Sequence, residues 1–193
     1  MNINNYFKNS SDTMLSIQKQ IDSIKEIAKN IYKSQKKGGK LLIAGNGGSS
    51  ADADHFAGEM TCTYSNPKRR PFNAISLSSN SAAVTAWAND FGFDSYYERQ
   101  LDAYAKKGDV LFLLSTGGGN IKKGYSMNLV KAAKMAIKKK IKLYSLVGKT
   151  GGELHKISNI SVKIDSFATS HIQEAHIAII HYICELLDKY EKK

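Results

Sequence analysis

Apolar residues recur along the chain in blocks whose spacing alternates between helical and extended periods. In the first block they stand three or four positions apart, at Ile17, Ile21, Ile24, Ala28 and Ile31. This spacing places them on one face of an amphipathic helix, which we predict over residues 10–37 and which Gly38 and Gly39 end. The last block has the same period and predicts a long helix over residues 170–189.

Short apolar runs alternate with further helical patterns between these two helices. We predict strands at residues 40–45, 72–77, 110–115, 143–147 and 160–164. Helices are predicted between them at residues 50–62, 81–87, 96–105 and 127–139. This alternation indicates an α/β fold with a doubly wound, five-stranded parallel sheet, helices on both faces and a ligand site at the carboxyl ends of the strands.

The length of the chain and the absence of internal breaks bear on its organisation. No linker, repeat or low-complexity stretch interrupts the 193 residues, so we expect residues 1–193 to form a single domain. Its core would span residues 40–165, and the N-terminal helix would be free to pack in an oligomer.

Composition places the chain among soluble globular proteins, with 42% hydrophobic and 23% charged residues. The longest apolar runs are too short to cross a bilayer, and the polar first ten residues lack a signal-peptide core. We therefore expect a cytoplasmic protein without membrane association. Cys62 and Cys184 fall within predicted helices and have no CxxC partner, so reduced, packed thiols are expected.

The formal net charge of +11 raises the question of an anionic partner. The basic residues are scattered in short groups, no aromatic residues are interleaved with them, and no helix-turn-helix or RNA-binding signature is present. This pattern argues against nucleic-acid binding. It favours solvated surfaces and attraction for a small phosphorylated substrate.

Two glycine-rich loops each connect a predicted strand to a predicted helix. The first, residues 45–50 (Gly-Asn-Gly-Gly-Ser-Ser), suits a phosphate or a sugar at a helix start, although a tight structural turn explains it equally well. It is neither a Walker loop nor a dinucleotide fingerprint. The second, residues 115–120 (Ser-Thr-Gly-Gly-Gly-Asn), adds two hydroxyls to backbone N–H groups. Two such loops at two strand ends predict a site for a phosphate monoester.

Histidines and carboxylates share faces of two predicted helices. His55 and Glu59 are four residues apart and lie on one face, where a metal could bridge them, although a surface hydrogen bond is the more frequent outcome. The last helix carries Gln173, His176 and His181, and a histidine on such an apolar helix is most often a core residue. The sequence leaves both interpretations open.

The remaining polar and aromatic candidates give weaker signals. Asn89 and Asp90 interrupt an apolar stretch and indicate either a capping turn or a pair of substrate contacts from a loop. We expect His155 and His171 at the surface. Packing is the expected role of Tyr64, Tyr96 and Tyr97.

Taken in order, five segments resemble the phosphoheptose isomerase family of the sugar-isomerase (SIS) domain superfamily. They are residues 45–49, 52–59, 89–93, 115–118 and 172–181. The resemblance covers nearly the whole chain, and the combination is more specific than any single motif. It implies a metal-assisted isomerase that converts sedoheptulose 7-phosphate to D-glycero-D-manno-heptose 7-phosphate through an enediol. It further implies homotetramers with active sites at subunit interfaces, one zinc per subunit, and a product used for lipopolysaccharide or capsule.

The resemblance also assigns roles to individual residues. It implies zinc ligands at His55, Glu59, Gln173 and His181 and catalytic roles for Glu59 and His181. It implies substrate contacts from Asn46, Gly47, Gly48, Ser49, Glu59, Asn89, Asp90, Ser115, Thr116, Gly117, Ser126 and Gln173. Gln173 and His181 are separated by about 12 Å of helix, so they serve one centre only by leaning together or from different subunits.

The chain departs from the family pattern in its second glycine loop. The family usually reads Ser-Thr-Ser-Gly-Asn-Ser there, whereas this chain has three glycines and extra residues before the helix resumes at Met127. Ser126 is the candidate to replace one displaced hydroxyl. Thr63 and Ser170 stand where an arginine and an acidic residue are common, which bears on substrate specificity. The alternative function is a non-catalytic SIS scaffold that associates with the replication initiator, against which the retained metal and base positions argue.

Overall fold

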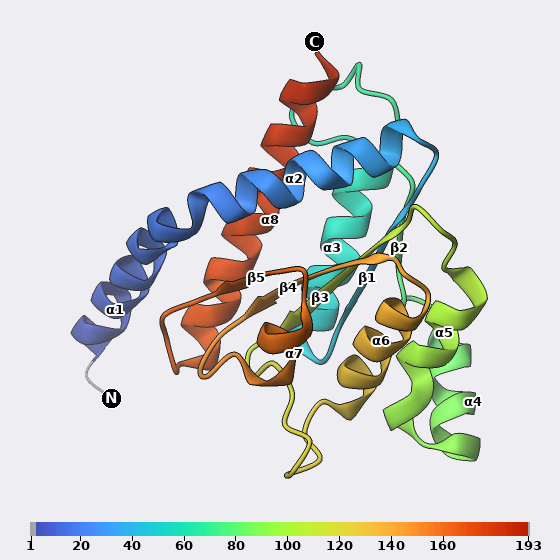
Figure 1. Cartoon of the computed structure of the whole chain (residues 1–193). Coiled ribbons are helices and arrows are strands. Elements are labelled where there is room, and N and C mark those ends of the chain that lie inside the picture. Colours follow the sequence, from blue (N-terminus) through green and yellow to red (C-terminus); the bar gives the residue numbers. More distant parts are fainter. Residues whose placement is uncertain (1–2, 193) are drawn as a thin grey trace.

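The computed structural model describes residues 3–192, and its centre is one sheet of five parallel strands (Figure 1). The strands are β1 (Leu41–Gly45), β2 (Ala74–Ser76), β3 (Val110–Ser115), β4 (Lys142–Val147) and β5 (Ile160–Lys163). Their order across the sheet is β2-β1-β3-β4-β5. Every strand predicted from the sequence is present, and the all-parallel pairing confirms the predicted α/β fold class.

The strands are apolar throughout because both faces of the sheet are covered. In β3, Val110, Phe112 and Leu114 point into one hydrophobic core, and Leu111 and Leu113 point into the other. All five are buried. A strand with two buried faces reads as a continuous apolar run rather than as an alternating one, which is the pattern seen in the sequence.

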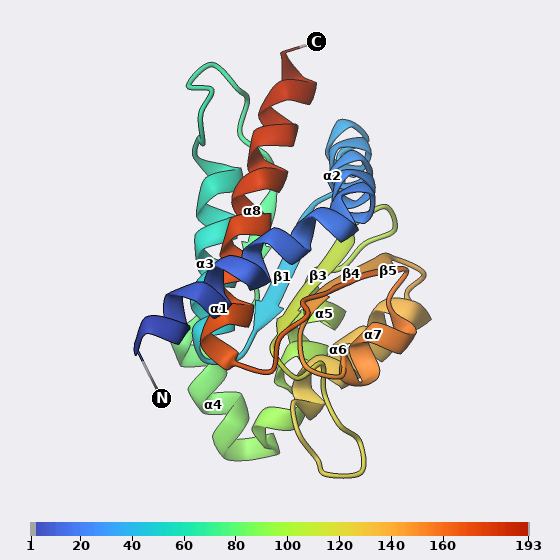
Figure 2. The same cartoon turned by 90° about the vertical axis from the view of Figure 1, so that its left-hand side faces the viewer.

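One face of the sheet is covered by α2 (Ile21–Lys36), α3 (Gly48–Thr61) and α8 (Thr169–Glu191), and α1 (Ile3–Ser16) lies against α8 (Figure 2). The prediction of one unbroken helix over residues 10–37 is wrong, since a 3₁₀ turn, η1 (Ile17–Gln20), separates α1 from α2. Thr13 and Ser16 donate back to preceding carbonyls, which bends helices, and Gln20 donates to the Lys163 carbonyl of β5.

The other face carries α4 (Ser81–Phe91), η2 (Phe93–Ser95), α5 (Tyr96–Tyr104), α6 (Met127–Lys138) and α7 (Gly152–Ile157). Helix α7 was not predicted, because it is six residues long and buries only Leu154, too little for an apolar period to emerge. Helix α4 extends beyond the predicted residues 81–87. In the part of the chain described, no helix has the length and apolar character needed to cross a membrane.

The strand order determines where a ligand can bind. Chain connections run in opposite directions from β1 and β3, so the carboxyl ends of these two neighbouring strands open onto a crevice, the usual ligand position in such sheets. Both predicted glycine loops begin at these strand ends. Because α3 and α8 each follow a strand and return along the same face, they lie side by side and run in the same direction (Figure 2).

Candidate active site

A cavity of about 410 Å³ opens where β1 and β3 end. Eight of the predicted substrate contacts line it: Asn46, Gly48, Ser49, Ser115, Thr116, Gly117, Ser126 and Gln173. Four further residues line it that were not predicted: Leu114, Tyr125, Lys149 and Thr169. Among the described residues, this wall contains no aspartate or glutamate and one lysine. Its hydroxyls, amides and single cation suit an anionic, hydroxyl-rich ligand.

The first glycine loop leads from β1 directly into α3. Gly47 has φ +56°, a left-handed value at which glycine is favoured, and it precedes the first helical residue. The Tyr97 hydroxyl donates to the Gly45 carbonyl at 2.5 Å, and burial raises the pKa of Tyr97 to about 12. The side-chain amides of Asn46 and Asn128 exchange two hydrogen bonds, of 3.0 and 2.7 Å. The loop is therefore held from behind while α3 begins at the cavity.

The second glycine loop is packed against the loop that follows β4. Gly118 has φ +68°, and a Cβ added there would lie 1.8 Å from the Gly151 carbonyl oxygen. The Gly118 N–H donates to Ser115 Oγ at 3.0 Å. The carbonyls of Gly118 and Gly119 accept the backbone N–H groups of Leu154 and Glu153. The prediction that the glycines at 117–119 offer their N–H groups to phosphate is therefore wrong for Gly118, because its N–H is already bonded to Ser115. Gly118 instead allows the two backbones to pack closely.

We refer to residues 117–119 and 151–152, which meet in this contact, as the glycine clamp. Residues 120–126 extend beyond it as a short turn in which Asn120 and Tyr125 exchange two backbone hydrogen bonds. This turn contains the extra residues noted in the sequence, and it returns Ser126 to the cavity with φ +53°.

Three of the four predicted metal ligands meet farther along α3 and α8. The Nε2 atom of His55 lies 3.0 Å from Nε2 of His181 and 3.4 Å from Oε1 of Glu59. Tyr64 stacks on the His181 ring. The Glu59 side chain is 24% exposed and that of His55 is 42% exposed, so the group can be reached from solvent. It combines a carboxylate with two imidazoles, the usual groups for proton transfer.

Gln173, the fourth predicted ligand, is not brought to this group on the same chain. Its amide lies against Gly48, where an added Cβ would be 2.5 Å from its Nε2, and it lines the cavity. Because α8 is unbroken between Gln173 and His181, the separation of about 12 Å along its axis is retained.

The donor types at this group fit zinc, which takes imidazole nitrogen and carboxylate oxygen. Nitrogens and oxygens around a tetrahedral zinc lie roughly 3.3 Å apart, given bonds of about 2.0 Å, and the two observed separations are close to this value. Both contacts involve His55, however, and within residues 3–192 no three His, Cys, Asp or Glu side chains surround a common point. One chain therefore supplies suitable ligands without a complete set around one position.

The end of α3 that carries Glu59 is fixed by a buried ion pair between Arg69 and Asp188. Arg69 Nε lies 2.6 Å from Asp188 Oδ1, and both side chains are 2% exposed. The Arg69 guanidinium also donates to the backbone carbonyls of Glu59 and Met60 at 2.7 and 3.0 Å. A cation at the last carbonyls of a helix stabilises that end. Arg69 thus holds the Glu59 end of α3 to the Asp188 turn of α8.

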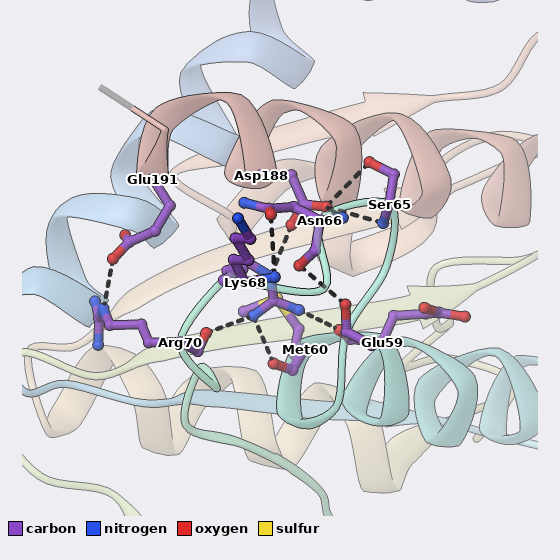
Figure 3. Close-up of polar contacts among 10 residues, drawn as sticks. Glu59, Met60, Ser65, Asn66, Lys68, Arg70, Asp188 and Glu191 are labelled. Carbon is purple, nitrogen blue, oxygen red and sulfur yellow. Dashed lines mark hydrogen bonds and ion pairs between the residues drawn. The ribbon is translucent and has the colours of Figure 1, made fainter.

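Asp188 completes the arrangement by ordering the connection after α3. Its Oδ2 accepts the N–H groups of Ser65 and Asn66 at 2.9 and 2.8 Å (Figure 3). The sequence showed Arg69 only as part of a basic group, and the structure reveals it as a buried structural residue.

The prediction that Asn89 and Asp90 lie in a loop is wrong. Both residues lie in the last turn of α4. Both are exposed, and the Asn89 amide donates to Asp90 Oδ1 at 2.8 Å. Neither residue lines the cavity. The helix extends past the predicted end because Gly92, with φ +83°, is the residue that ends it.

Other polar residues differ from prediction in their burial. His171 is 3% exposed rather than at the surface, because Tyr6 of α1 packs edge-on against its ring. Cys62 is exposed rather than packed, since α3 ends at Thr61, whereas Cys184 is buried, and both thiols are free. Asp52, one turn before His55, was not singled out, and burial raises its pKa.

Three further side chains have the burial expected from the sequence, and His176, for which two interpretations were open, lies in the core. Tyr96 and Tyr97 are core residues, His155 is exposed, and His176 is fully buried.

A family model and curated relatives with similar sequences point to the same protein family. The family model for the SIS domain matches residues 5–148. The chain is 37% identical over 179 residues to the phosphoheptose isomerase of Helicobacter pylori, covering 91% of this chain and 90% of that protein. It is 42% identical over 154 residues to the phosphoheptose isomerase of Campylobacter concisus, covering 80% and 78%.

A solved structure gives the same result for the fold. The phosphoheptose isomerase of Francisella tularensis superposes with a TM-score of 0.89 at 30% identity, covering 97% of this chain and 96% of that one. The match covers 90% of the Helicobacter pylori protein and 96% of the Francisella tularensis chain. The chain belongs to the phosphoheptose isomerase family of SIS-domain proteins, and it is a sugar-phosphate isomerase.

Proposed function

We propose that this enzyme converts sedoheptulose 7-phosphate to D-glycero-D-manno-heptose 7-phosphate through an enediol. The observation that carries the proposal is that two polar sites lie along α3. One is the cavity at Gly48, and the other is the cluster of His55, Glu59 and His181, which we call the Glu59 group. Seven residues of helix, about 10 Å, separate Gly48 from His55. An extended seven-carbon sugar phosphate has a comparable length, so its phosphate and its carbonyl end can occupy the two sites together.

Glu59 is the base in this proposal, and His181 is its acid partner. Glu59 removes a proton from C1 of the ketose while His181 donates a proton to the C2 oxygen, which gives the enediol. Glu59 then returns its proton to C2, and His181 takes the proton from the C1 oxygen as the aldehyde forms. His55 contacts both side chains and keeps them close. Binding of the phosphate in the cavity holds the sugar in register for this transfer.

We further propose that His55, Glu59 and His181 hold one zinc per subunit, with Gln173 as the fourth ligand. Zinc bound there supplies a Lewis acid for the charge that develops on the substrate oxygens. The 12 Å between Gln173 and His181 favours a centre to which neighbouring subunits contribute, as in the proposed homotetramer with active sites at its interfaces. Zinc content of the purified protein, measured by mass spectrometry, should fall in His55→Asn. Equal zinc in both proteins would contradict this ligand set.

Surface features of the N-terminal helices support an oligomer. Phe7 and Leu15 of α1 are 71% and 60% exposed, and an apolar groove of about 320 Å³ lies between η1, α2 and α8. Exposed apolar surface of this kind is typical of subunit contacts. Sedimentation velocity should give the mass of four chains, and a monomer would contradict the proposal.

The proposed product would supply activated heptose for lipopolysaccharide or capsule. Non-catalytic association with a replication initiator is the less favoured function, because the matched relatives carry the name of an isomerase.

The decisive experiment is turnover of sedoheptulose 7-phosphate by Glu59→Gln, which keeps the shape of the side chain and removes the base. We expect the rate to fall by about a hundred- to ten-thousand-fold with an unchanged melting temperature. Glu153→Gln is the matched control, since Glu153 has a similar exposure, 22%, and lies outside the cavity and the Glu59 group. If Glu59→Gln kept more than a tenth of the parent rate, Glu59 would not be the base.

A further inference from the structure

Lys149 is the only cation in the wall of the cavity among the described residues, and no aspartate or glutamate lines that wall. It is half-buried, and none of the ion pairs within residues 3–192 involves it. A lysine without a carboxylate partner beside several hydroxyls and backbone N–H groups provides the charge that a phosphate monoester requires.

The backbone holds Lys149 at this position in an unfavourable conformation. Its φ is +51°, in the left-handed region that side chains other than glycine rarely adopt. Two contacts impose it: the Lys149 N–H donates to the Ser166 carbonyl at 2.9 Å, and the glycine clamp fixes the residues that follow. Gly148, just before it, is pressed against Ile172 of α8, where an added Cβ would lie 2.4 Å away. Non-glycine residues held in this region concentrate at binding sites.

We propose that Lys149 binds the phosphate group of the substrate. The inference rests on the proposed function for the identity of the sugar, and on the cavity alone for the phosphate. The glycine clamp then has a role in binding, because it fastens the loop of β4 to the loop of β3 and so brings a cation to the hydroxyls of Ser115 and Thr116. Three strand ends, rather than two, would build the phosphate site.

The test is calorimetric titration of the full chain with sedoheptulose 7-phosphate and, separately, with inorganic phosphate. Lys149→Met removes the charge and keeps the length of the side chain, whereas Lys149→Arg retains the charge. Lys140→Met is the matched control, since Lys140 also has a left-handed φ, of +55°, but follows α6 and does not line the cavity. Melting temperatures of all variants identify any loss of folding.

We expect Lys149→Met to weaken binding of both ligands by about 10- to 100-fold, the usual loss for a hydrogen bond to a charged group. Lys149→Arg should remain within about threefold of the parent, and Lys140→Met should bind as the parent does. Unchanged binding by a folded Lys149→Met, or no binding of either ligand by the parent, would overturn the inference. If the parent binds both ligands but does not isomerise the sugar, the proposed function fails while the assignment of Lys149 stands.

Discussion

The two glycine-rich loops look equivalent in the sequence, but the structure uses them in different ways. After β1, Asn46, Gly48 and Ser49 of the first loop line the cavity, and nothing lies within 4 Å of a Cβ added to Gly47, although one added to Gly45 would lie 2.2 Å from the Ser49 carbonyl oxygen. After β3, Gly118 and Gly119 are closed against the backbone of residues 151–152 and the side chain of Val130. Gly47 and Gly48 thus leave the first loop accessible at the cavity, whereas Gly118 and Gly119 allow close packing in the second.

This difference separates two kinds of functional dependence. Changes at Gly48 should alter ligand binding and leave folding intact, because an added Cβ there meets only the flexible Gln173 side chain. Changes at Gly118 and Gly119 should alter folding first, and binding only through the position of Lys149. Three glycine variants test this division, and the acid response of a buried histidine beside β4 tests the support of the loop after β4.

Gly118→Ala should have the largest effect on stability. Its Cβ would meet the Gly151 carbonyl, and a left-handed φ disfavours alanine, so we expect a loss of about 3 kcal/mol in the free energy of unfolding. Urea denaturation measures it. A loss below about 1 kcal/mol would mean that the two loops yield easily and that the glycine clamp is not rigid.

The stability of the fold near the end of β4, just before the loop of Lys149, should respond to acid. Burial lowers the pKa of His176, which lies close to the Val147 backbone at the end of β4, from 6.5 to about 4. The unfolded chain takes up this proton at higher pH than the folded one does. This difference in pKa therefore contributes about 3 kcal/mol to the free energy of unfolding. The contribution is fully present above about pH 6.5 and is lost progressively as the pH falls toward 4.

Urea denaturation between pH 4 and pH 8 measures this dependence in the parent and in His176→Leu. The variant should lose most of the slope, and His155→Gln, at an exposed histidine, should keep it. Parallel curves for the parent and His176→Leu would show that other groups cause the acid sensitivity.

Gly48→Ala should affect binding rather than folding. An added Cβ meets only the end of the flexible Gln173 side chain, at 2.5 Å, so Gln173 can move away from the cavity at little cost to stability. We expect the KM for sedoheptulose 7-phosphate to rise about tenfold. Gly58→Ala in the same helix, with open space around it, is the control. A normal KM for Gly48→Ala would exclude Gln173 from substrate binding.

Gly117→Ala should change stability least, by less than about 0.5 kcal/mol. Nothing lies within 4 Å of its added Cβ, and its φ is not left-handed. The melting temperatures of Gly117→Ala and Gly118→Ala, measured side by side, compare two neighbouring glycines directly. A comparable loss for both would show that the whole run, rather than Gly118 and Gly119, forms the packed contact.

Much of the fold followed from local patterns. All five strands and most helices were predicted, because apolar runs, helical spacing and glycine stops act over short stretches of chain. The errors lie where local signals are weak or are overridden: the break at Ile17–Gln20, the short helix α7 and the extension of α4 over Asn89 and Asp90. In the site, the structure brings the residues of both loops together around the cavity and places His55 beside His181, whereas their roles stay predictions.

By itself, the sequence determined the alternation of strands and helices, the position of polar loops at strand ends and the family of the protein. Only the tertiary structure decided which glycines are open and which are packed, that Arg69 is buried against Asp188, and that Lys149 reaches the cavity. The physical reason is range. Periodicity and turn chemistry act between near neighbours, whereas burial, close backbone approach and ion pairing depend on residues that meet only when the chain has folded.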